Sequence, residues 1–172
     1  EVLHSYPLAF CLVGVIGYLV GSTQGTFEAF RSLQSIWHFT NFTVGHSHLT
    51  MYGFVTFGIW GGLYALLPLA TGRRASRWGL GAHFWMAVVG SFIYVISLSV
   101  GGTMQGLDWK HGLPFIQSVV DMSPYYVWRG VGGVLMFASH LVFAWNVWDM
   151  TLRRPAASVV TAAAAPAAEG GA

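Results

Sequence analysis

Four long apolar stretches dominate this sequence and limit the folds that it can adopt. They cover residues 6–21, 46–69, 78–100 and 125–148. A helix needs about 20 mostly apolar residues to cross the hydrocarbon core of a bilayer; the first stretch is slightly short, but residues 22–27 can extend it. Only 8% of the 172 residues are charged, against roughly 25% in an ordinary soluble domain. We therefore predict an all-α fold, a polytopic membrane bundle of about four transmembrane helices.

The charged and cysteine residues disfavour several classes of function. The eight Lys and Arg residues are scattered one to three at a time and leave a net charge of +2. They cannot form a face that tracks phosphates, so we expect no nucleic-acid partner. The single cysteine, Cys11, rules out an intrachain disulfide and a cysteine-based metal cluster. The sequence has no Ser-His-Asp set, phosphate loop or HExxH motif, so hydrolase and nucleotide chemistry lack support.

Two groups of arginines predict how the spans are oriented. They are Arg73, Arg74 and Arg77 after the second span, and Arg153 and Arg154 after the fourth. Both groups fall on the same side of the membrane if the third and fourth spans run out and back, and short basic loops mark the cytoplasmic side. Residues 31–43 and 101–124 then lie on the opposite side.

The chain divides into two parts. Residues 1–152 form the predicted transmembrane bundle, and residues 153–172 are an Ala-rich tail that we expect to be disordered, because it has no apolar periodicity. The chain begins with Glu, and no secretory leader is recognisable, so we expect a piece of a longer polytopic protein. Glycines in the second and fourth spans predict close helix packing, because small residues let helices approach each other. They are Gly58, Gly61, Gly62, Gly130, Gly132 and Gly133.

Two histidines open the second span. His46 and His48 are two residues apart, which separates their side chains by about 200° around an α-helix. They cannot both bind one metal from a regular helix, but they can bind two metals, one on each side. Because imidazole is a common axial ligand of haem iron, the spacing suggests a helix between two haems. The alternative, two interfacial histidines that face lipid headgroups, is left open by the spacing alone.

Other polar residues near the span ends can assist such a site. His38 and Arg129 can donate hydrogen bonds to haem propionates, although Arg129 can equally extend its charge to the interface. Gln24 and Glu28 precede the second span, and a carboxylate there can relay protons or orient an axial histidine. We favour a simpler interpretation of Glu28, an i, i+3 ion pair with Arg31 on a short surface helix. His83 and His140, which lie within spans, are interpreted as hydrogen-bonded packing residues.

Three segments together resemble a known family. The stretch HFTNFTVGHSHLTMYGFVTFGIWGGLYALLP (residues 38–68) resembles the haem-ligand helix of the catalytic subunit of haem–copper oxidases. GGTMQGLDWK (residues 101–110) and SPYYVWRGVGGVLMFASHLVFAWNVW (residues 123–148) resemble the C-terminal part of subunit I of the cbb3-type cytochrome c oxidases. The likeness runs from residue 6 to residue 148, with MQG expected as a turn and PYYVxR as the start of the last helix.

The resemblance implies roles for individual residues. His46 would be the proximal ligand of the high-spin haem, where oxygen is reduced, and His48 one of two axial ligands of the low-spin haem. His38 and Arg129 match propionate contacts. Gln24 stands where many members carry a glutamate near the high-spin haem; a glutamine cannot titrate, so a proton relay there would depend on Glu28. The implied cofactors are two haems, expected to be b-type.

The resemblance also implies a larger assembly. The copper ligands of the family, its cross-linked tyrosine and the other low-spin haem histidine lie on helices upstream, so this chain would hold no copper and be inactive alone. Expected partners are the N-terminal helices of subunit I, membrane-bound cytochrome c subunits and the lipid of a bacterial inner membrane. The implied reaction is the reduction of O2 to water by cytochrome c, coupled to proton movement. Two alternatives remain open: a nitric oxide reductase subunit, and a haem-free accessory membrane subunit.

Overall fold

The computed structural model describes residues 5–152, and the chain is helical along nearly all of that length. The helices are α1 (Tyr6–Glu28), α2 (Arg31–Trp37), α3 (Asn41–His48), the π-helix η2 (Leu49–Thr56), α4 (Phe57–Thr71), α5 (Arg77–Lys110), α6 (Phe115–Asp121) and α7 (Ser123–Thr151). The expected tail, residues 153–172, lies outside the described residues.

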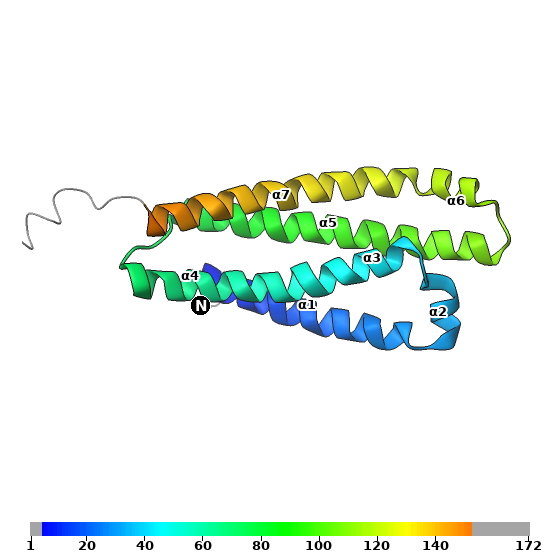
Figure 1. The fold of residues 1–172 in the computed structure, drawn as a ribbon, viewed down its shortest axis with the longest axis horizontal. Helices are drawn as coiled ribbons and strands as arrows, with labels where there is room; N and C mark the ends of the chain where they lie inside the picture. The colour runs from blue at the N-terminus through cyan, green and yellow to red at the C-terminus, as the bar shows by residue number, and fades with distance from the viewer. Residues whose placement is uncertain (1–4, 153–172) are drawn as a thin grey trace, which may run out of the picture.

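Four continuous helical segments are long and apolar enough to cross a membrane. They are Tyr6–Glu28, Asn41–Thr71, Arg77–Lys110 and Ser123–Thr151. Figure 1 shows them as an elongated bundle in which α1 lies beside α3–α4 and α5 lies beside α7, with the short helices α2 and α6 at one end. The predicted all-α membrane bundle is confirmed, and the protein is a multi-pass membrane protein.

The third span is longer than predicted. Helix α5 continues to Lys110, so the MQG segment that we expected as a turn is helical. The reason lies in close backbone contacts: a Cβ on Gly102 would overlap the backbone nitrogen of Phe42, and a Cβ on Gly106 would overlap the carbonyl oxygen of Ile36. The glycines, which look like loop residues in the sequence, let the end of α5 pack directly against α2 and the start of α3.

Close packing of the span glycines is confirmed at two positions and wrong at three. A Cβ on Gly61 would lie 2.8 Å from the Pro7 carbonyl oxygen, and one on Gly132 would lie 2.7 Å from the Gly90 carbonyl oxygen. A Cβ would meet no atom within 4 Å at Gly58, Gly62 or Gly130. A side chain at these three positions would meet no neighbouring helix, so glycine is not required there, although the Gly58 backbone itself lies close to Gly14 of α1.

The centre of the bundle is aromatic. Phe10 of α1 is fully buried, and its ring lies 5.1–5.9 Å from the rings of Phe57, Trp60, Tyr64 and Phe84. Such contacts join α1 to α4 and α5. Because lipid gives little hydrophobic drive for helix association, tight contacts of this kind hold a membrane bundle together.

Candidate functional site

The histidine-bearing helix α3 begins with a defined cap. The Thr40 hydroxyl accepts a hydrogen bond from the backbone N–H of Phe42 (3.2 Å), and the backbone N–H of Asn41 donates to Gln105 Oε1 (3.0 Å). Two of the four N–H groups that a helix leaves without internal partners are thereby satisfied. The bond to Gln105, which is 5% exposed, fixes the start of α3 on α5, and so fixes the register of the two histidines.

His46 faces α1. Its Nδ1 lies 3.4 Å from Gln24 Oε1; because the amide oxygen only accepts, Nδ1 carries the proton. The Gly25 position is also close, since a Cβ there would lie 3.5 Å from the ring. Gln24 and Gly25 of α1 therefore set the orientation of this half-buried imidazole, and its Nε2 keeps an available lone pair.

His48 faces α5. Its Nδ1 donates to the carbonyl oxygen of Val44 at 2.8 Å, one turn back in the same helix. The imidazole centroid lies 4.5 Å from that of the Tyr94 ring. As in His46, the protonated Nδ1 leaves Nε2 free to bind a metal.

The two imidazoles therefore lie against different helices. A metal-ligating histidine usually donates its second ring nitrogen to a carbonyl or similar acceptor, which fixes the tautomer and the ring plane, and both residues have such an acceptor. Within residues 5–152 no cluster of three or more His, Cys, Asp or Glu could hold a metal ion. The donor set suits two separate metal-containing groups, each of which would take one imidazole from α3, better than a single metal held by protein ligands alone.

Arg129 lies on the His48 side of α3. Its Nε donates to the Tyr94 hydroxyl at 3.2 Å, and its guanidinium carbon is 5.8 Å from the centroid of that ring. Tyr94 thus contacts both Arg129 and His48, and links the cation to the same side of α3 as this imidazole. This arrangement suits an anionic group bound beside His48.

His38 lies apart from these residues, in the exposed link between α2 and α3. Gln34 Nε2 donates to its Nδ1 at 2.9 Å, and its ring lies 3.9 Å from that of Phe39. Phe39 has a φ of 62° and is 84% exposed, a conformation that is costly for a bulky residue. Among the described contacts, none joins His38 to either His46 or His48.

The expected ion pair between Glu28 and Arg31 is wrong. Helix α1 ends at Glu28 and α2 begins at Arg31, so the two residues do not share a helix and the i, i+3 geometry is absent. Glu28 Oε1 is instead buried, with no hydrogen-bond partner among the described residues. Its side chain lies one turn beyond Gln24, the residue that contacts His46.

The family model for cytochrome c and quinol oxidase polypeptide I matches residues 2–135. The chain belongs to this family. A cytochrome c oxidase subunit 1 homolog of Azorhizobium caulinodans is 32% identical over 167 residues, which cover 92% of this chain and 30% of that protein. The cbb3-type cytochrome c oxidase subunit CcoN1 of Stutzerimonas stutzeri is 33% identical over 156 residues, covering 85% and 33% respectively.

A third relative, cytochrome c oxidase subunit 1 of Rhodobacter capsulatus, is 34% identical over 166 residues. The alignment covers 89% of this chain and 31% of that protein. The chain thus spans about a third of the length of these relatives. The resemblance to subunit I of the cytochrome oxidases, with a cbb3-type subunit among the relatives, is confirmed.

Three features of this oxidase-family chain have no recognisable signal in its sequence. Tyr94, which links Arg129 to His48, looks in the sequence like one more aromatic residue of an apolar span. The π-helix η2 begins directly after His48, and π-helical turns often occur at functional sites, but no hydropathy pattern marks it. The third is a buried chain of hydrogen bonds, from Asn146 Nδ2 to the Tyr64 hydroxyl (2.9 Å) and on to His83 Nδ1 (2.8 Å). It confirms that His83 is a hydrogen-bonded packing residue, fully buried within the bundle.

Proposed function

We infer that this chain is the C-terminal part of the catalytic subunit of a cbb3-type cytochrome c oxidase. In this proposal His46 is the proximal ligand of the high-spin haem, and His48 is an axial ligand of the low-spin haem, both of b type. One observation carries the proposal: two imidazoles of α3 lie against different helices, each with Nδ1 bonded to an acceptor and Nε2 free. The cbb3-type relative supports the choice of subtype.

The residues around the two histidines would orient the imidazole rings and hold the haem propionates. Gln24 fixes the ring of His46 from α1, and the Val44 carbonyl fixes the ring of His48 from within α3. The N–H groups of Arg129 that do not bind Tyr94 are available to a propionate, and His38 offers a further donor near the same end of the bundle. The bound haems would supply electron transfer and oxygen chemistry; the protein sets their positions and electronic properties through these contacts.

The complete assembly would reduce O2 to water with electrons from cytochrome c, coupled to proton movement across a bacterial inner membrane. The copper ion, its histidines and the second axial ligand of the low-spin haem would come from the N-terminal helices of the same subunit. Membrane-bound cytochrome c subunits would be the electron-donating partners. Because this chain offers one ligand to each haem and none to copper, it would not turn over alone.

Alanine substitution of each histidine in the complete oxidase tests the proposal. We expect His46→Ala to remove the high-spin haem signal and His48→Ala the low-spin signal, as measured by optical spectra of the purified, reduced complex. His111→Ala, in the exposed link between α5 and α6, is the matched control and should retain both signals. If neither substitution at the site lowers haem content, the chain is a haem-free accessory subunit and the proposal fails.

Metal analysis of the same complex tests the choice between oxidase and nitric oxide reductase. We expect copper, and no iron beyond that of the haems. Non-haem iron in place of copper would assign the chain to a nitric oxide reductase.

A further inference from the structure

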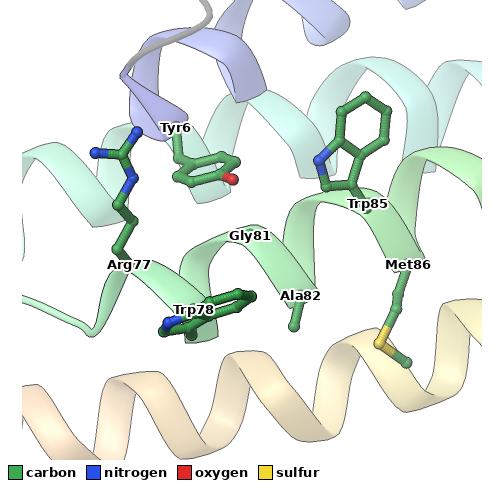
Figure 2. Close-up of a pocket in the computed structure, with 7 residues that line it drawn as sticks. All are labelled: Tyr6, Arg77, Trp78, Gly81, Ala82, Trp85 and Met86. Carbon is green, nitrogen blue, oxygen red and sulfur yellow. The ribbon is translucent and has the colours of Figure 1, made fainter.

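Two cavities meet at the end of the bundle that carries the α4–α5 loop. The larger, of about 640 Å³, runs along α5 from Tyr6 and Arg77 to Trp85 and Met86. Figure 2 shows Arg77 and Tyr6 at one end of it, Trp85 and Met86 at the other, and Trp78 beside Arg77. The second cavity, of about 460 Å³, shares Tyr6 and Arg77 with the first. The two cavities are therefore neighbours that meet at Tyr6 and Arg77.

Both cavities are lined mostly by apolar residues, but the smaller one also has two arginines and the larger one has Arg77 at its end. Arg74 and Arg77, both exposed, line the smaller cavity together with polar groups such as the Ser5 hydroxyl. Beyond Arg77 the larger cavity is lined by aromatic and aliphatic side chains and by Gly81. Among the residues that the structure describes, none of those lining either cavity is an Asp or Glu. The site therefore suits a ligand with an anionic head and an apolar tail.

The length of the apolar part matches one leaflet of a bilayer. Arg77 and Met86 are nine positions apart in α5, which at 1.5 Å per residue is about 14 Å. Half of a hydrocarbon core about 30 Å thick is about 15 Å. Trp78 is 90% exposed and adjoins the basic end, the position that tryptophan favours at a membrane interface. Arg77 would then lie at headgroup level and Met86 near the bilayer midplane.

We propose that the two neighbouring cavities, together called the groove, bind an anionic phospholipid. Its phosphate would lie between Arg74 and Arg77, and one acyl chain would lie along Trp78, Ala82, Trp85 and Met86. Basic pockets at the ends of transmembrane helices are suited to acidic lipid headgroups, and a guanidinium binds phosphate through two parallel hydrogen bonds. The site is separate from His46 and His48. The inference rests on the membrane placement of the helices and not on the haem roles of those histidines.

Native mass spectrometry of the purified complex that contains this chain tests the site. The complex in detergent is titrated with phosphatidylglycerol and, separately, with phosphatidylcholine. We expect phosphatidylglycerol to bind more tightly, and Arg77→Gln to weaken its binding about fivefold, the size of effect expected for one basic residue near an acidic headgroup. Lys110→Gln removes the same charge at the opposite end of α5 and should leave lipid binding unchanged.

A second variant keeps the test decisive if Arg77→Gln does not assemble. Ala82→Trp fills the apolar part without touching the charges and should abolish phosphatidylglycerol binding, while the haem spectra of the complex stay as in the wild type. Equal binding of the two lipids, or equal binding by Arg77→Gln and Lys110→Gln, would overturn the proposal. So would a photo-crosslinking residue at Ala82 that captures a protein segment in place of lipid, whether that segment belongs to the same subunit or to another chain, because protein would then cover the groove.

Discussion

His46 and His48 differ in how the chain holds their rings. His48 is bonded at 2.8 Å to a carbonyl of its own helix, so its orientation follows from α3 alone. His46 is bonded at 3.4 Å to Gln24, a side chain of α1, so its orientation depends on how α1 packs beside α3. The sequence spacing predicted that the rings would diverge, but it could not show which contact was local and which crossed between helices.

Gln24 should tune the haem that His46 is proposed to bind. Gln24→Leu removes the acceptor of the Nδ1 proton, which makes the imidazole a weaker donor to iron. We expect the midpoint potential of the high-spin haem to rise by about 40 mV, since a hydrogen bond contributes about 1 kcal/mol and 1.4 kcal/mol corresponds to about 59 mV for one electron. A spectroscopic redox titration of the complete oxidase measures the shift.

Gln24→Glu is the matched variant, because a carboxylate is a stronger acceptor at the same place. Its effect should have the opposite sign, a lower midpoint potential. Shifts of the same sign in both variants, or none in either, would show that Gln24 does not act through His46.

Tyr64 joins two other buried polar side chains, so its hydroxyl should stabilise the bundle. Tyr64→Phe leaves the Asn146 amide and His83 Nδ1 without their partner. We expect the free energy of unfolding to fall by about 1–2 kcal/mol, measured as a lower thermal midpoint of the purified complex. Tyr18→Phe, on an exposed face of α1, is the control and should leave that midpoint unchanged. An equal effect of the two substitutions would contradict a specific role for the buried chain.

At the scale of elements, apolar length predicts the spans well and their ends poorly. Residues 46–69 and 125–148 fall within the observed helices Asn41–Thr71 and Ser123–Thr151. The extension of α5 through Gly101 and Gly102 was missed, because glycine is a poor helix former in isolation. Here its lack of a side chain is what permits the contact with Phe42. Helix propensity describes an isolated helix, whereas this part of α5 is stabilised by its contact with α3.

Gly102 should be required at the contact between α5 and α3. The Cβ of Gly102→Ala would overlap the Phe42 backbone, which cannot move as a flexible side chain does, so we expect a cost at or above the ~1–3 kcal/mol typical of overpacking. The start of α3 would shift, and the yield of assembled, haem-containing complex should drop. Gly62→Ala adds the same methyl group where no atom lies within 4 Å, and should be tolerated. Wild-type yield and thermal midpoint for Gly102→Ala would show that the two helices can separate without loss.

At the scale of the whole molecule, the two ends of the bundle have different chemistry. The α4–α5 end carries Arg73, Arg74 and Arg77 and the proposed lipid groove. Near the other end lie the cap of α3, His38 and Arg129. The amino-acid composition predicted a membrane bundle and the arginines an orientation, but the grouping of Arg129, Tyr94 and His48 required the packing of α3, α5 and α7.

The orientation of the bundle follows from this asymmetry and can be measured directly. If the arginine-rich end is cytoplasmic, a cysteine at Arg74 should be shielded from a membrane-impermeant maleimide added to intact spheroplasts, and a cysteine at His111 should react. Cys11, the only cysteine of these 172 residues, is first replaced by Ala, and the same background without an introduced cysteine shows the labelling due to any other thiol. Both cysteines should react after the membrane is permeabilised, which controls for local accessibility. Labelling of Arg74→Cys and protection of His111→Cys in intact spheroplasts would invert the orientation, and would move the proposed lipid groove to the outer leaflet.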